Sequence, residues 1–169
     1  MYILRQINFD VDSESIQQFN KTVRFPIVST DIATEELDDY FGAPSIEGFA
    51  LGIFEGDRLV ANIQCSTAGF LATDGDSDML FLSNRDIVFS IETLPEFRHR
   101  GYANRLLQSA FDLTPWSLFI GVIAYKDITN RKLKEFYSNT GFDVSKYEKG
   151  FVTHSPMKQE VGLTKIFIK

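Results

Sequence analysis

The sequence predicts an α/β domain with a mixed central sheet flanked by helices, and three observations carry this prediction. The chain has 169 residues, 44% of them hydrophobic, which suffices for one domain, 1–169, with a substantial core. Two apolar segments in the first half flank a turn sequence, which is typical of an antiparallel hairpin. In the second half, two continuous apolar runs enclose an amphipathic segment, which is the order of a parallel strand pair with its connecting helix.

The chain is expected to begin with a strand over 2–9, where apolar residues roughly alternate. A helix is expected over 13–23, because Asp12 and Ser13 are favoured residue types at a helix start. A second helix is expected over 31–40, and the Gly and Pro that follow it indicate a loop.

The predicted hairpin has strands over 48–54 and 58–68, and Gly56 between them supplies the positive φ of a tight turn. Residues 70–84 contain the sequence TDGDSD and are expected to form a long loop.

The second half is expected to contain a strand over 86–94, rich in β-branched residues and buried on both faces. Its neighbour is a strand over 117–125, which the helix over 101–113 connects to it by a right-handed crossover. The two strands should therefore be parallel.

A helix is expected over 129–140, with Thr129 as its cap and Gly141 at its end. A strand should then begin at Phe142, and residues 163–169 should form the last strand.

Composition excludes several classes of function. The net charge of −6 disfavours a broad nucleic-acid-binding face, and a single Cys excludes an intramolecular disulfide and a zinc site built on several thiolates. Only two His are present, so we expect no metal site. The N-terminus lacks the pattern of a signal peptide and no apolar run is long enough to span a bilayer, so a cytoplasmic protein without membrane contact is expected.

The most informative stretch is Arg98-His99-Arg100-Gly101-Tyr102-Ala103, between a predicted buried strand and a predicted helix start. The first N–H groups of a helix lack partners in the helix and carry partial positive charge. Gly101 has no side chain and lets an anion approach the backbone, while Arg98 and Arg100 add positive charge. These features predict a phosphate site. The alternative is a solvated pair of arginines beside an ordinary turn glycine.

This stretch resembles the cofactor-binding motif of the GNAT superfamily of N-acetyltransferases: Arg or Gln, two residues, Gly, one residue, then Gly or Ala. A second family motif is matched by Asn130, Phe136-Tyr137 and Gly141-Phe142. The resemblance covers about 86–142, roughly a third of the chain. It implies a GNAT-like acyl-CoA N-acyltransferase fold.

The sequence departs from the family pattern at three positions. Thr93 stands where Val is common, and Leu133 stands where Ala is frequent. His99 stands where Gly or Asn is usual. None of the three removes a group that the chemistry needs, although Leu133 affects packing near the cofactor.

The resemblance implies that acetyl-CoA lies across two parted parallel strands. Asn130 would contact its pantetheine arm from one side. On the other side, the arm would bind backbone groups of Ile91, Thr93 and Leu94. The pyrophosphate would rest on the N–H groups of Arg98, His99, Arg100, Gly101, Tyr102, Ala103 and Asn104.

Two catalytic residues follow from this resemblance. Glu92 is the expected base for the acceptor amine, directly or through water, because a carboxylate in an apolar strand has a raised pKa. The alternative is that Glu92 faces solvent at a strand edge. Tyr137 is the expected acid for the departing sulfur, and its alternative is core packing. Thr93 or a neighbour would donate an N–H to the thioester oxygen.

Other candidates are weaker. The carboxylates of Asp74, Asp76 and Asp78 resemble the start of a calcium loop, but Met79 stands where the required Gly belongs. Cys65 is expected to be a buried structural thiol and His154 a surface residue. The acidic run over 35–39 is expected to be a solvated helix face, or to guide a cationic substrate.

The expected function is transfer of acetyl from acetyl-CoA to a primary amine of a small molecule or a peptide, by direct attack in a ternary complex. The acidic balance favours a cationic acceptor slightly. Family members are often dimers, so a homodimer is one assembly that the resemblance allows, but the sequence itself does not determine the oligomeric state. One alternative is a non-catalytic CoA-binding module with the same fold, and a further alternative is an α/β domain without any cofactor.

Overall fold

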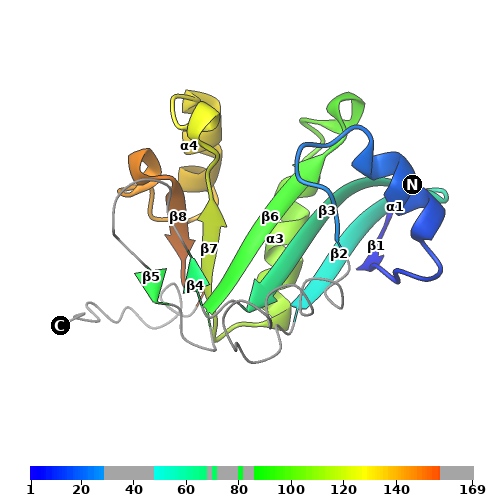
Figure 1. The fold of residues 1–169 in the computed structure, drawn as a ribbon, viewed down its shortest axis with the longest axis horizontal. Coiled ribbons are helices and arrows are strands. Elements are labelled where there is room, and N and C mark those ends of the chain that lie inside the picture. The colour runs from blue at the N-terminus through cyan, green and yellow to red at the C-terminus, as the bar shows by residue number, and fades with distance from the viewer. Residues whose placement is uncertain (29–47, 68–69, 72–79, 82–85, 157–169) are drawn as a thin grey trace.

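The computed structural model describes residues 1–28, 48–67, 70–71, 80–81 and 86–156. Within them, six strands form one mixed sheet in the order β1-β2-β3-β6-β7-β8, and β4 pairs with β5 in a separate two-stranded sheet. Helix α3 lies behind the large sheet in Figure 1, and the blue N-terminal segment crosses in front of it. The predicted fold class is therefore confirmed. The helix expected over 31–40 and the strand expected over 163–169 lie outside the described residues.

The N-terminal elements match the prediction but are shorter. Strand β1 covers Ile3–Gln6 and pairs antiparallel with β2, and helix α1 covers Ser13–Asn20. The helix ends before residue 23 because the Asn20 side chain holds the backbone of Ile27, accepting from its N–H at 2.8 Å and donating to its carbonyl at 2.9 Å. This pair of bonds turns the chain after α1 back toward the sheet.

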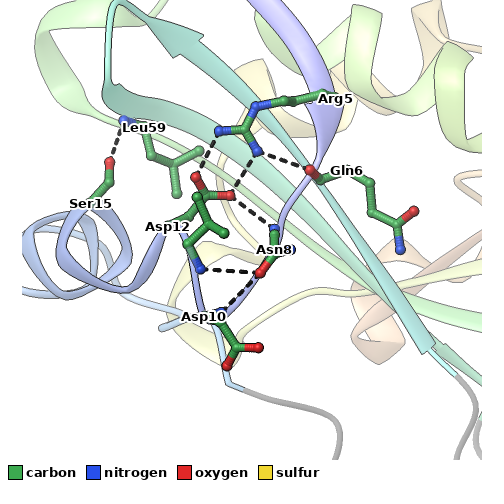
Figure 2. A network of polar contacts seen from close by, with 8 residues as sticks. Arg5, Gln6, Asn8, Asp10, Asp12, Ser15 and Leu59 are labelled. Atoms are coloured by element: carbon green, nitrogen blue, oxygen red, sulfur yellow. Dashed lines mark hydrogen bonds and ion pairs between the residues drawn. The ribbon is translucent and has the colours of Figure 1, made fainter.

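An ion pair fixes the connection between β1 and α1. The Arg5 guanidinium donates to both carboxylate oxygens of Asp12, each at 2.7 Å, and the Asn8 N–H donates to the same carboxylate at 2.9 Å (Figure 2). Asp12 is buried, with 6% of its surface exposed. Asp12 precedes the helix, as expected, but its side chain bonds Arg5 and Asn8 and forms no cap bond with the helix.

We expect Asp12→Ala to lower the free energy of unfolding at pH 7 by about 1–3 kcal/mol, because it leaves the donors of Arg5 and Asn8 without their charged acceptor. The Arg5 guanidinium holds the pKa of Asp12 below its usual range. A lowered folded-state pKa adds stability above the unfolded pKa of about 3.9 and loses it as pH falls through the folded value. Urea unfolding should therefore show the wild type and the variant converging below about pH 4.

Asp10→Ala is the matched control, because Asp10 is exposed and its carboxylate makes no contact in Figure 2. Equal stability of both variants and the wild type at pH 7 would contradict the role given to Asp12.

The predicted hairpin is confirmed. Strands β2 (Gly48–Glu55) and β3 (Arg58–Thr67) pair antiparallel, and Gly56 in the turn has φ +62°. The loop expected over 70–84 is only partly correct, because β4 (Phe70–Leu71) and β5 (Leu80–Phe81) pair antiparallel within it.

The predicted parallel pair is also confirmed. Strands β6 (Asp86–Thr93) and β7 (Leu118–Val122) run parallel, and helix α3 (Tyr102–Leu113) connects them. The helix packs on β2, β3 and β6. Its buried residues are Tyr102, Leu106, Leu107, Ala110 and Phe111. The expectation that the whole strand is buried on both faces was wrong, because residues 90–93 are only partly buried.

Two predictions in the last part of the chain are corrected. Helix α4 covers Arg131–Asn139, and its cap is Asn130 rather than Thr129, because the Asn130 side chain accepts from the N–H of Leu133 at 3.2 Å. In place of the strand expected to begin at Phe142, the structure has a single antiparallel bridge between Asp143 and Thr153. The last described strand, β8, covers Phe151–His154 and pairs antiparallel with β7.

Among the described residues, no helix combines the length and the apolar character that crossing a membrane requires.

Candidate functional site

The site begins where β6 and β7 part. Their pairing ends at Phe89 opposite Gly121, although β6 continues through 90–93. This last part of β6 pairs with β3 on one side only. Figure 1 shows the two arrows side by side at one end and diverging toward the other. The edge of β6 that faces β7 is therefore available to a ligand that pairs like an added strand.

An aromatic ring occupies the point where the strands part. A Cβ at position 121 would lie 2.8 Å from the Phe89 ring and 3.0 Å from Val152, so only Gly fits there. The ring of Phe89 also packs against Tyr137 and Phe142, with centroid distances of 6.4 and 5.6 Å. Phe89 thus links the end of the strand pairing to the C-terminal end of α4.

A cavity of about 1380 Å³ opens between the parted strands. This volume exceeds the 300–1,000 Å³ of typical small-molecule pockets, so the cavity has room for two reactants. Most residues predicted from the sequence line it. They are Ile91, Glu92, Thr93, Arg98, His99, Gly101, Tyr102, Ala103, Asn104, Asn130 and Tyr137. Leu94 and Arg100 do not line it.

The turn before α3 presents a run of free amides. No described residue accepts a hydrogen bond from the backbone N–H groups of 99–104, and α3 has no side-chain cap. His99 and Gly101 both have left-handed backbone, with φ +63° and +79°. A Cβ at Gly101 would meet nothing within 4 Å, so its surroundings are open. Free N–H groups at a helix start beside open space are suited to a phosphate anion.

The left-handed φ explains one departure from the family pattern. His99 stands where Gly or Asn is usual, and these are residues that tolerate positive φ most easily. The substitution therefore keeps the turn at the cost of local backbone strain, of a kind that is concentrated at functional sites.

The structure explains why Leu94 and Arg100 lie outside the cavity. Both backbone groups of Leu94 are used within the fold: its N–H donates to Val60 at 3.0 Å and its carbonyl accepts from Phe97 at 2.9 Å. The Arg100 guanidinium donates to Glu55 at 3.1 Å, at the end of the β2–β3 hairpin. Neither Leu94 nor the side chain of Arg100 is thus placed for the contact expected of it.

Sequence reasoning missed Glu55. Its carboxylate accepts hydrogen bonds from both Arg100 and the hydroxyl of Tyr102. Glu55 therefore holds the turn over 99–104 against the β2–β3 hairpin. No local pattern connects positions 55 and 102, since the contact exists only once β2 is folded against α3.

Glu92 lines the cavity. It lies in the part of β6 that pairs with β3 but not with β7, and its side chain is half-buried rather than fully exposed to solvent. Burial raises the pKa of the Glu92 carboxyl above its usual value, against the opposing effects of a 3.3 Å hydrogen bond from the N–H of Phe25 and of Arg98 and Arg24. A half-buried carboxylate with a raised pKa is a stronger base than an exposed one.

Tyr137 lies in the aromatic cluster and also lines the cavity. Only 4% of its surface is exposed, and burial raises the pKa of its hydroxyl above 10, so the group stays protonated at neutral pH. No hydrogen-bond partner for this hydroxyl is present in the described part of the chain. The residue therefore combines core packing with a place in the cavity lining.

Two further predicted site residues, Arg98 and Asn130, also form hydrogen bonds within the fold. The Nε of Arg98 donates to the carbonyl of Thr93 at 3.2 Å, which ties the turn to the end of β6. The side-chain oxygen of Asn130 caps α4, so its amide NH₂ remains for a ligand in the cavity.

The segment that follows α1 forms one wall of the cavity, and sequence reasoning missed it. Arg24 forms an ion pair with Asp127 in the connection between β7 and α4. The side chain of Gln64 on β3 donates to the carbonyl of Val28 at 2.7 Å. These contacts join positions up to 103 residues apart, so no local sequence pattern could show them.

Of the weaker candidates, Cys65 and His154 do not line the cavity. Cys65 is buried, and burial raises the pKa of its thiol, which makes it unreactive. His154 is not a surface residue as expected, because it is 4% exposed and stacks on Phe111. Within the described ranges, no three His, Cys, Asp or Glu residues form a metal-binding group. Asp74, Asp76 and Asp78 lie outside those ranges, as does the acidic run over 35–39.

No protein-family model matches the chain, and no curated protein matches it. Solved structures do match. The loading GNATL domain of CurA from Lyngbya majuscula has a TM-score of 0.60 at 13% identity, covering 93% of this chain and 98% of that domain. A GNAT family acetyltransferase from Brucella melitensis, in complex with acetyl-CoA, has a TM-score of 0.54 at 13% identity, covering 92% and 88%.

An N-acetyltransferase from Staphylococcus aureus Mu50 has a TM-score of 0.54 at 12% identity, covering 90% of this chain and 94% of that one. The likeness extends over nearly the whole length of each protein, well beyond the third of the chain in which the sequence motifs lie. Together with the parted parallel strands and the open amide turn, these comparisons show that the chain has the fold of the GNAT family of acetyltransferases.

Proposed function

We propose that the protein is an acetyl-CoA-dependent N-acetyltransferase that acetylates a primary amine by direct attack in a ternary complex. The observation that carries this proposal is the run of free amides at 99–104 next to an unpaired strand edge at 90–93. A diphosphate needs the first feature, and an extended amide-containing arm needs the second.

The residues present fit CoA. The backbone N–H groups of 99–104 would hold the pyrophosphate, with the Arg98 guanidinium beside them. Ile91 and Thr93 would offer backbone groups to the pantetheine arm, whereas Leu94 has none to spare. The amide NH₂ of Asn130 would contact the arm from the opposite wall. When bound, acetyl-CoA supplies a thioester that is reactive toward amines.

Glu92 and Tyr137 supply the proton transfers. Most amines are protonated at neutral pH and cannot attack, so Glu92 takes a proton from the acceptor nitrogen, directly or through a water. Tyr137 is protonated and donates toward the departing sulfur. Much of the remaining rate gain comes from holding both reactants in one cavity.

We expect Tyr137→Phe to lower kcat by about 100-fold or more, because it removes the proton donor while the ring keeps its packing. The affinity for CoA should stay unchanged, which isothermal titration calorimetry can measure. Tyr2→Phe is the matched control, since Tyr2 does not line the cavity. If turnover in Tyr137→Phe is unaltered, the proton for the departing sulfur comes from water and not from Tyr137.

The proposed function is tested with the purified chain in two assays. Thermal shift with CoA reports binding, and thiol release from acetyl-CoA with a panel of small amines, polyamines, aminoglycosides, amino acids and peptides reports transfer. Binding together with amine-dependent thiol release supports the proposal. Tight binding without release on any amine would indicate a non-catalytic CoA-binding module, and the absence of any thermal shift would indicate a domain without a cofactor.

A further inference from the structure

Strand β3 carries a buried polar side chain that the function proposed above does not use. Asn62 is 2% exposed, and its side-chain oxygen has no hydrogen-bond partner in the described part of the structure. A buried acceptor without a donor destabilises the fold relative to a satisfied one. Buried polar groups in native proteins are seldom left in this state, so the oxygen of Asn62 calls for a donor.

Its neighbour across the sheet is Glu92. The two residues are directly opposite each other in the antiparallel β3–β6 pair. Directly opposite side chains lie on the same face, with Cβ atoms about 4.5–5.5 Å apart. Glu92 lines the cavity and Asn62 does not, so Asn62 can influence a reactant only through Glu92.

The protonation state of Glu92 decides whether it can bond to this oxygen. An ionised carboxylate only accepts hydrogen bonds, whereas a protonated carboxyl has one O–H to donate. A bond to the Asn62 oxygen would therefore exist only after Glu92 has gained a proton, and it would favour that form.

The other polar groups near Glu92 act in different directions. Arg98, Arg24 and the N–H of Phe25 favour the ionised form, while burial favours the protonated form. The hydroxyl of Tyr137 stays neutral over the range in which Glu92 titrates. Arg98, Arg24 and the Phe25 N–H only donate, so they cannot accept the proton of Glu92. The Tyr137 hydroxyl can accept as well as donate, but the function proposed above uses it toward the sulfur. The Asn62 oxygen is an acceptor directly across the sheet that no donor in the described part of the structure satisfies.

We propose that Asn62 is the positioning residue of Glu92, and that its side-chain oxygen accepts a hydrogen bond from the carboxyl group whenever Glu92 holds the proton taken from the acceptor amine. The carboxylate oxygen of Glu92 that takes the proton from the amine nitrogen then donates it in a hydrogen bond to the Asn62 oxygen, and the proton returns to solvent when the product leaves. The bond forms after the proton transfer and fixes the orientation of the carboxyl group while it carries the proton. This assignment rests on the proposed function, in which Glu92 is the base.

The test is the titration of the Glu92 carboxyl carbon by ¹³C NMR in the full chain without substrate. Removal of the acceptor in Asn62→Ala should lower the pKa of Glu92 by about 0.4–1 unit, the equivalent of one hydrogen bond. Asn62→Asp should have the opposite effect, because two adjacent carboxyl groups raise one apparent pKa. An unmoved Glu92 pKa in both variants would overturn the pairing.

Two controls keep the result interpretable. Thermal unfolding shows whether each variant folds. If Asn62→Ala does not fold, the NMR titration of Glu92 in Asn62→Asp by itself tests the pairing. In an active enzyme, the acidic limb of the kcat/KM profile should move in the same direction as the NMR titration in each variant. If the pKa of Glu92 measured by NMR changes but the acidic limb of the kcat/KM profile does not, the catalytic part of the proposal is overturned. The hydrogen bond between Asn62 and Glu92 would still be supported.

A separate variant shows whether the proposed function itself fails. Wild-type turnover in Glu92→Gln would remove Glu92 as the base and overturn the catalytic role of Asn62 with it, whatever the NMR titration shows.

Discussion

Gly101→Glu is expected to bind CoA at least tenfold more weakly than the wild type, a loss of about 1.4 kcal/mol or more. The new carboxylate would stand at the start of α3 among the free amides, where it would repel the pyrophosphate and compete for the same N–H groups. Isothermal titration calorimetry with CoA measures the effect directly. Arg98→Ala, which removes a cation from the cavity wall, should weaken binding in the same direction.

Gly101→Ala is the control that distinguishes the effect of the new charge in Gly101→Glu from the effect of placing any side chain at a positive φ. Gly101 has φ +79°, so any other residue costs about 1–2 kcal/mol of stability there. The alanine Cβ meets nothing within 4 Å, so this variant should be less stable but should bind CoA much better than Gly101→Glu. Unchanged affinity in both Gly101→Glu and Arg98→Ala would contradict the phosphate site.

Glu92→Gln is expected to lower kcat/KM by about 10²–10⁴-fold at neutral pH, because glutamine cannot take a proton from the amine. The affinity for CoA should be unchanged, since the phosphate-binding turn is left intact. Burial raises the pKa of Glu92, so the wild-type rate should fall as the pH drops through that raised value and the base becomes protonated. Glu92→Gln should lose this acidic limb.

Glu96→Gln is the matched control for this variant. Glu96 is close in sequence, forms an exposed ion pair with Arg58 and does not line the cavity. Its substitution should leave both the rate and the pH profile as in the wild type. A Glu92→Gln enzyme that keeps the acidic limb would show that another group titrates in it.

The strand that positions Glu92 was predictable because its signals are local. The β-branched run of β6, the proline after it and the glycine before α3 each specify backbone conformation within a few residues. The same holds for the Gly56 turn of the hairpin. The signal for the turn before α3, where we predict phosphate binding, is also local, since a helix start provides its own free amides.

The errors at Phe142 and Thr129 arose where local signals compete. The apolar character of Phe142 suits a strand as well as the aromatic cluster, in which its ring packs against Phe89, Phe111 and Tyr137. Both Thr129 and Asn130 are acceptable caps, and the cap is the residue whose side chain reaches Leu133. In each case the deciding partner is a tertiary or backbone contact that composition does not specify.

The sequence by itself determined most of the order of strands and helices, the parallel strand pair and the arginine- and glycine-containing turn over 98–103. Hydrophobic periodicity and turn chemistry, which specify these features, act over short distances in the chain. The tertiary structure decided which of the predicted groups do not line the cavity and which distant residues support it. It turned Arg100 toward Glu55, used both backbone groups of Leu94 within the fold, and set Asn62 opposite Glu92. Such choices depend on strand register and on contacts between distant segments, which form only when the whole sheet assembles.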